Sequence, residues 1–164
     1  MNNRQRVFDF LKELAIEYEL IEHPAAPTIA EAMKYWKAID AAHCKNLFFR
    51  NHKGNKHYLV VFDARQQLAI HELEKRLKQG KLSFASEKRM GKYLGVYPGS
   101  VSPFGLINDK ENHVHLFVDA RLQTCQRISF HPNDNTASLV IAFSDFLKVL
   151  ANSGNSYEFI DLYD

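Results

Sequence analysis

A lysine and an asparagine stand side by side where the chain enters what the sequence predicts to be a buried strand. Lys45 and Asn46 lie in HCKNLFFR (43–50), and the apolar run HYLVVFDA (57–64) follows closely. Burying an ammonium group without a partner is energetically costly. We therefore expect Lys45 to meet an anion, which is either a carboxylate of the same fold, such as Asp63 or Asp134, or part of a ligand.

A second candidate is the glycine- and proline-rich segment YPGSVSPFGLIND (97–109). Small residues let a backbone approach a ligand closely, and amides exposed in such a loop can hold a carbonyl oxygen or position a water. The alternative is a segment that only reverses the chain. It is not a phosphate-binding loop, because no G-K-[ST] follows, and it lacks the G-x-S-x-G spacing of a nucleophile elbow. The candidate residues are Gly99, Ser100, Val101, Ser102, Pro103, Phe104 and Gly105.

A third candidate is His131, which begins the sequence His-Pro-Asn-Asp after the strand-like RISF (127–130). Pro132 fixes the backbone there, so an ordinary turn explains the pattern. In the functional interpretation, His131 lies at the same rim as Lys45 and Asn46 and donates or accepts one hydrogen bond. The spacing in the sequence does not choose between the two.

Nucleophilic catalysis and metal binding are poorly supported by the sequence. No spacing ties a nucleophile to a base, and Cys44 beside a buried-looking strand is typical of a small core residue. His113 and His115 would project from one face of a strand, but no third ligand occurs at a telling distance. The nucleophiles considered are Ser100, Ser102, Cys44 and Cys125.

Apolar periodicity predicts the elements that must position these residues. Helices are expected at 4–18, from the Thr28–Glu31 capping box through Trp36, from Ile70 to Gly80, at 86–94 with Ser86 as cap and Gly95 as stop, and near 144–151. Strands are expected at 18–23, 44–50, 57–63, 113–118, 124–130, 137–142 and 157–162, with Gly54 in a turn between the second and third. Hairpins with interspersed helices favour an α+β fold over a regularly alternating parallel α/β sheet.

The composition is that of one globular domain spanning residues 1–164. The chain has 164 residues, 46% of them hydrophobic, and no apolar run long enough to cross a bilayer. The N-terminus lacks a signal-peptide pattern, which points to a cytoplasmic protein. The two cysteines, Cys44 and Cys125, are far apart in the sequence and form no C-x-x-C motif, which suggests reduced thiols rather than a disulfide scaffold. A net charge of +2 is too small to argue for nucleic acid by itself.

The distribution of charge indicates one basic segment. Seven lysines and arginines occur from Lys75 to Lys92, with Glu87 as the one acidic residue in that span. Such a segment can contact phosphates, and Lys88 and Arg89 are the candidates for this contact. The alternative is a solvated face of two surface helices.

Taken together, the motifs resemble the YbaK/ProX family of aminoacyl-tRNA deacylases, related to the editing domain inserted into bacterial prolyl-tRNA synthetases. The resemblance is carried by HPAAPTIAEA (23–32), CKNLFFR (44–50), YLVVFDA (58–64), FASEKRMGKYLGVYPGSVSPFGLIND (84–109) and ISFHPNDNTASLVI (128–141). It covers nearly the whole chain. The pair KN with FHP resembles the free-standing ProX branch, which clears alanine from tRNA(Pro).

The resemblance implies a fold, a substrate and a set of roles. The fold is a mixed, largely antiparallel, β-barrel-like sheet flanked by helices. Lys45 meets the phosphate region of the terminal adenosine of a mischarged tRNA, and backbone amides of 99–103 hold the scissile carbonyl or the water. Asn46, His131 and Thr28 contact the substrate, as do Val101, Ser102, Phe104 and Gly105. Neither cofactor nor metal is implied, nor a membrane or DNA partner; prolyl-tRNA synthetase is a candidate partner.

Other functions are compatible with these residues. One is a deacylase for cysteine or another small misacylated amino acid. Another is a catalytically silent module that binds tRNA or a synthetase, although it would not need to keep Lys45, Gly99 and Pro103. A third, a metal-dependent hydrolase, would be exposed by sensitivity to chelators.

Overall fold

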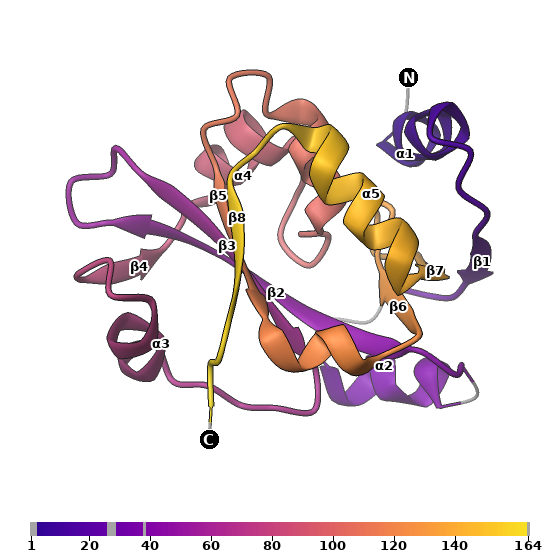
Figure 1. Cartoon of the computed structure of the whole chain (residues 1–164), viewed down its shortest axis with the longest axis horizontal. Coiled ribbons are helices and arrows are strands. Elements are labelled where there is room, and N and C mark those ends of the chain that lie inside the picture. Colours follow the sequence, from indigo (N-terminus) through magenta and orange to yellow (C-terminus); the bar gives the residue numbers. More distant parts are fainter. Residues whose placement is uncertain (1–2, 26–28, 38, 164) are drawn as a thin grey trace.

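A single curved sheet with helices on both faces organises the computed structural model (Figure 1), which describes residues 3–25, 29–37 and 39–163. The strand order is β1-β7-β6-β2-β3-β5-β8, and β4 pairs with β2. Pairs β1–β7, β7–β6, β2–β3 and β2–β4 are antiparallel, whereas β2–β6, β3–β5 and β5–β8 are parallel. The expected α+β fold with a mixed, largely antiparallel sheet is confirmed. The strands are β1 (Glu19–Glu22), β2 (Ala42–Asn51), β3 (His57–Asp63), β4 (Leu82–Phe84), β5 (His115–Asp119), β6 (Arg127–Phe130), β7 (Ala137–Ala142) and β8 (Tyr157–Ile160).

Helices cover the sheet on its two faces. No helix in the described ranges is long and apolar enough to cross a membrane. The α-helices are α1 (Asn3–Glu13), α2 (Ile29–Trp36), α3 (Ile70–Leu77), α4 (Glu87–Leu94) and α5 (Phe143–Ser153), and the 3₁₀ helices are η1 (Pro103–Asn108) and η2 (Ala120–Thr124).

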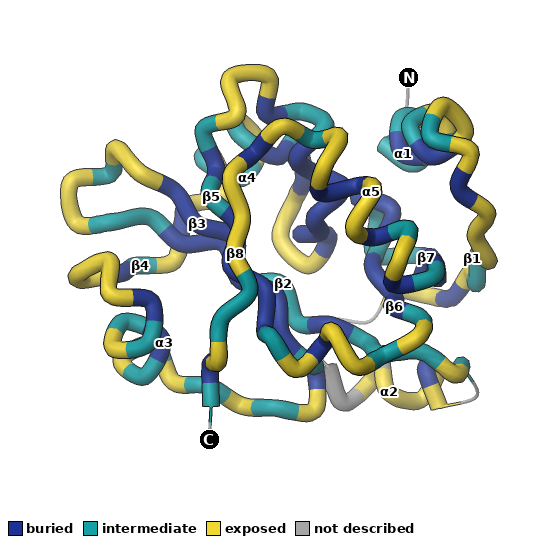
Figure 2. Tube along the Cα trace, viewed as in Figure 1, coloured by how far each residue is buried: buried dark blue, intermediate teal, exposed yellow. Residues whose placement is uncertain are grey.

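Successive side chains of the central strands pack into two separate hydrophobic cores, because side chains alternate between the faces of a sheet. Phe48 of β2 packs in a large cluster with α1, α4, η1 and α5, on what we call the α5 face. Its neighbour Phe49 packs in a smaller cluster with α3, on the α3 face. Strand β3 is buried on both faces, and Figure 2 shows it as dark blue tube. The central sheet is therefore a rigid support for whatever its strand ends carry.

The helix that leads to the glycine-proline segment has the ends that the sequence predicts. The Ser86 hydroxyl accepts a hydrogen bond from the Arg89 amide at 3.2 Å, which caps α4. Gly95 ends the helix with φ +65°, a conformation that favours glycine. The chain therefore leaves α4 in a defined direction toward residues 97–109.

Four local predictions need correction. The first helix ends at Glu13 rather than 18, because Ala15 adopts φ +56° and turns the chain toward β1. Helix α3 ends at Leu77, before Gly80, because Lys78 also adopts φ +56°. Residues Pro103–Asn108 form a 3₁₀ helix rather than a loop, since proline suits a first helical turn and Ser102 caps it. The three-residue strand β4 was too short to detect by periodicity.

Candidate active site

Lys45 is half-buried on β2 and has no anionic partner among the residues that the structure describes. Its ammonium lies 5.9 Å from the centre of the Phe62 ring and makes no ion pair with any described residue. Of the two carboxylates that could have neutralised it, Asp63 pairs with Arg65 at 2.7 Å. The other, Asp134, lies 3.4 Å from Arg4 and accepts a hydrogen bond from the amide of Thr136. Within the described chain, neither carboxylate therefore neutralises Lys45. The charge of its ammonium group is available to a ligand.

His131 follows β6, the parallel neighbour of β2. The two strands pair Ala42 with Ile128 and His43 with Ser129, and the pairing ends there. Continuing this register by two residues would set Lys45 level with His131. Beyond His43 the two strands are no longer hydrogen-bonded, so Lys45 and His131 border the point where the sheet divides.

Asn46 borders the same point from the other side of the sheet. It follows Lys45 directly, so strand alternation points it to the α5 face, while Lys45 points to the α3 face. The Asn46 amide nitrogen donates to the Cys44 carbonyl at 3.5 Å, and its oxygen is buried without a hydrogen-bond partner in the described residues. A group lying between β2 and β6 can thus contact both side chains.

The His131 ring is held neutral and oriented. Its Nδ1 lies 2.7 Å from the Ala137 carbonyl, which can only accept, so Nδ1 carries the hydrogen and Nε2 is left as an acceptor. Burial lowers the pKa of His131, and the Ala137 carbonyl offsets this effect in part. Near neutral pH the ring therefore presents an uncharged acceptor beside Lys45.

A chain of polar contacts that the sequence did not reveal supports this face of the site. His23 lies with its ring centroid 6.1 Å from that of His131, and its Nε2 lies 2.9 Å from the Ser138 hydroxyl. The Trp36 indole donates to the same hydroxyl at 3.1 Å and stacks on His43 at 4.6 Å. In the sequence, segment 23–32 shows the end of a strand at His23 and a capping box at Thr28–Glu31, and neither pattern links His23 to Ser138. The contact of His23 with Ser138 spans 115 residues, which periodicity cannot detect.

The first half of the glycine-proline segment borders the His131 turn. Gly99 has φ +86°, and a side chain there would approach the Asn135 amide at 3.3 Å. The backbone amides of Val101 and Ser102, both on buried residues, make no hydrogen bond to any described group. Two such donors are free to bind an oxygen atom. The amide of Ser100 donates to the Tyr97 carbonyl and so keeps the turn closed.

The second half of the segment packs into the core. The Ser102 hydroxyl accepts from the Phe104 amide at 3.0 Å, and Pro103 begins η1. Phe104 lies edge-on to Phe130 at 6.0 Å. A β-carbon at Gly105 would lie 2.9 Å from that of Leu94, so glycine allows η1 to approach α4. These contacts give Phe104 and Gly105 structural reasons for their identity, and their contact with a substrate stays a prediction.

The basic candidates lie away from this point, at the far end of β2. Lys88 and Arg89 line a pocket of about 300 Å³ with Gly54, Ser86, Lys92 and Tyr93. Arg89 donates to the Gly54 carbonyl at 2.8 Å and to Nε2 of His57 at 2.9 Å, which ties α4 to the β2–β3 hairpin. Its charge is therefore partly engaged, while Lys88 is exposed.

The remaining sequence candidates have simpler explanations. Cys44 is buried in the core on the α5 face, and burial raises the pKa of its thiol, so it is a poor nucleophile. His113 contacts His57 at 2.8 Å, whereas His115 contacts Ser156 and Glu158, so the two histidines do not share a site. No group of three or more potential metal ligands occurs among the described residues. Thr28 lies outside them.

Within the described residues, a lysine without an ion pair and a neutral histidine thus border the divided sheet, and two backbone amides without hydrogen bonds lie in the neighbouring turn. The model of the aminoacyl-tRNA editing domain matches residues 23–149. The chain therefore belongs to the aminoacyl-tRNA editing domain family, which confirms the resemblance to YbaK/ProX deacylases.

Individual relatives agree with this assignment. The chain is 41% identical to the prolyl-tRNA editing protein ProX of Acetoanaerobium sticklandii, over 99% of both chains. It is 32% identical to prolyl-tRNA synthetase associated domain-containing protein 1 of Bos taurus, over 88% of this chain and 86% of the relative. A crystal structure described as "a putative trans-editing enzyme for prolyl tRNA synthetase" shares the fold, with a TM-score of 0.72, 20% identity and 98% of both chains covered.

The surroundings of His57 make the free energy of unfolding depend on pH. Burial, followed by the nearby His113 and the positive charges of Arg89, Lys92 and Arg50, lowers the pKa of His57 from 6.5 to about 4. The unfolded chain therefore takes up a proton at a higher pH than the folded chain, so the free energy of unfolding must fall as the pH drops from 6.5 to 4. We expect His57 to account for about 2–3 kcal/mol of this loss.

Urea denaturation of the wild type and of His57→Gln across this pH range measures the effect. The variant should be less stable at pH 7 and should lose less stability on acidification. His52→Gln, on the exposed hairpin turn, is the matched control and should retain the wild-type slope. Equal slopes for wild type and His57→Gln would contradict the assignment.

Proposed function

We propose that this protein hydrolyses the ester bond of mischarged tRNA(Pro), with Ala-tRNA(Pro) as its main substrate. The observation that carries the proposal is the unpaired ammonium of Lys45 beside the His131 turn and the free amides of Val101 and Ser102. The names of the relatives, prolyl-tRNA editing protein and prolyl-tRNA synthetase associated protein, support tRNA(Pro) as the substrate and prolyl-tRNA synthetase as a partner.

In this mechanism Lys45 binds the phosphate of the terminal adenosine. A phosphate between β2 and β6 would supply the anion that the fold does not, and a charge-assisted hydrogen bond is stronger than a neutral one. Thr28 and Asn46 would contact the same nucleotide or its aminoacyl group. Placing the 3′ end here fixes the ester relative to the glycine-proline turn.

The turn at 99–103 would then stabilise the reacting carbonyl. The amides of Val101 and Ser102 are donors fixed before the substrate arrives, which is what stabilisation of an oxyanion requires. Gly99, Ser100 and Pro103 hold the turn in its shape. The Nε2 atom of His131 would accept a hydrogen bond from a ribose hydroxyl. An aminoacyl ester is already activated, and its ribose hydroxyl can assist the attack of water, so positioning supplies most of the acceleration.

Size would select the amino acid. A pocket fitted to a methyl side chain excludes proline by overlap, which discriminates more strongly than a missing methylene group. Rejection of serine or cysteine would be weaker. The alternative substrates, Cys-tRNA or another small aminoacyl-tRNA, and the alternative of binding without hydrolysis are outcomes of the same assay.

A panel of Ala-, Cys-, Ser- and Pro-charged tRNA(Pro) tests the proposal. We expect kcat/KM to be highest for alanine, lower by roughly 10- to 200-fold for side chains larger by about one heavy atom, and undetectable for proline. Hydrolysis should withstand a chelator. A maximum at cysteine would assign the alternative specificity, and binding without turnover would refute the deacylase function.

Replacing Lys45 by alanine separates function from folding. Loss of the contact with phosphate should lower kcat/KM by about 100-fold, or about 3 kcal/mol. Because Lys45 makes no ion pair in the described chain, the free energy of unfolding should change by less than about 0.5 kcal/mol. Lys56→Ala, at the exposed far end of the same hairpin, is the control for general loss of charge. Turnover by Lys45→Ala at the wild-type rate would exclude the role.

The basic pocket is proposed to contact the acceptor stem. Lys88→Glu should raise KM and reduce the slope of log KM against log salt by about one, the expectation for one phosphate contact. Arg89→Ala should instead destabilise the fold, since Arg89 ties α4 to the hairpin. Lys148→Glu on α5 is the control, and unchanged KM and salt slope for Lys88→Glu would discard the contact.

A further inference from the structure

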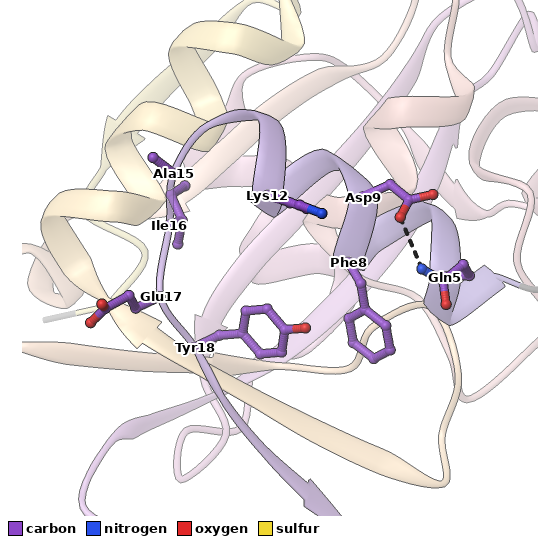
Figure 3. A pocket seen from close by; sticks show the side chains of 8 residues that line it. All are labelled: Gln5, Phe8, Asp9, Lys12, Ala15, Ile16, Glu17 and Tyr18. Atoms are coloured by element: carbon purple, nitrogen blue, oxygen red, sulfur yellow. Dashed lines mark hydrogen bonds between the residues drawn. The ribbon is translucent and has the colours of Figure 1, made fainter.

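An open groove lies on the outer side of α1, where no part of the proposed mechanism takes place. It has a volume of about 600 Å³ and is formed by one face of α1 and the chain that descends from it at 15–18. Figure 3 shows the rings of Phe8 and Tyr18 side by side in it. These rings are stacked at 5.4 Å with only 5° between their planes, and Tyr18 is 40% exposed. The groove therefore offers a flat aromatic surface to a partner.

The groove runs directly into a free strand edge. Tyr18 is followed at once by β1, which ends the strand order and pairs only with β7 among the described strands. The His23 amide donates to Thr136 across this pair, so by alternation the backbones of Ile21 and Glu19 face β7. The backbone groups of Leu20 and Glu22 therefore face away from the sheet. An unpaired edge of this kind can accept an added strand.

The charge of residues 9–22 is acidic, although Lys12 itself lines the groove. Residues 9–22 contain five acidic side chains and a single cation, Lys12. Glu19 and Glu22 are paired with Arg127 and Arg4. Glu13 and Glu17 are exposed and make no ion pair with any described residue. The negative potential that remains repels a nucleic-acid backbone and attracts a basic chain.

We propose that the α1–β1 groove docks an extended, basic segment of a partner protein. The segment would pair with the outward backbone groups of Leu20 and Glu22, place an apolar side chain against Phe8 and Tyr18, and direct lysines or arginines at Glu17 and Asp9, which line the groove. A second copy of this chain fits less well, because a two-fold interface would bring the same acidic surface against itself. The partner would thus hold the enzyme by a surface that leaves the basic pocket and Lys45 open to tRNA.

The probe is a labelled seven-residue peptide in which lysine alternates with valine and phenylalanine, compared with a peptide that has glutamate in place of lysine. Fluorescence anisotropy should show saturable binding of the basic peptide alone. Glu17→Lys should raise Kd by about tenfold, and Glu111→Lys, on an exposed turn elsewhere, should leave it unchanged. Amide resonances of Leu20 and Glu22 should shift on titration.

A second pair of variants tests the strand edge itself. Glu22→Pro removes an outward amide without removing a hydrogen bond to β7, whereas Glu22→Gln removes the same charge and keeps the amide. The proline variant should bind at least about fivefold more weakly than the glutamine variant, with both retaining wild-type deacylation of free mischarged tRNA. Equal binding by the two variants, equal binding of the acidic peptide, or no binding would overturn the proposal. Displacement of the peptide by an acceptor-stem duplex would assign the groove to RNA, and self-association lost in Glu22→Pro would assign it to a second copy; either result overturns it.

Discussion

Strands β2 and β6 are hydrogen-bonded for only two residues on each strand, and the site follows from that short pairing. A longer parallel ladder would close the gap between the two strands beside Lys45 and His131. Because the ladder stops at His43 and Ser129, the sheet divides where the KN pair begins. Side chains from both faces, Lys45 and Asn46, can then approach one group. The rest of the sheet, buried on both sides at its centre, holds this division in place.

Charge around the division is arranged so that Lys45 stays available. Asp63 and Asp134 are the internal anions that could neutralise it, and each is engaged by an arginine close by. Burial lowers the pKa of His131, and also that of His43, so neither ring competes for an anion near neutral pH. Within the described residues, the half-buried Lys45 ammonium therefore has no carboxylate paired with it.

Local sequence patterns were enough to predict most helices and strands. They failed to predict the helix ends that depend on one residue in a left-handed conformation. Ser86 and Gly95 bounded α4 correctly, because a cap and a left-handed glycine act through their own neighbours. Ala15 and Lys78 ended helices in a left-handed conformation that their types do not favour, so only tertiary contacts could indicate it. The individual site residues were identifiable as types. The opposite directions of Lys45 and Asn46, and the contact of His23 with Ser138, depend on strand register and pairing across the sheet.

Basic and acidic side chains gather in different parts of the domain. The cations that neighbour His57 lie at the hairpin end of β2 and β3, and the acidic residues 9–22 lie on α1 and at the β1 edge of the sheet. A tRNA is a polyanion, so the first region would attract it and the second region would repel it. A protein that hands over a charged tRNA must hold the enzyme without covering its RNA-binding side. The α1–β1 groove is acidic and borders the free edge of β1, at one end of the strand order. Its charge would favour a basic partner over tRNA, whichever groups cleave the ester.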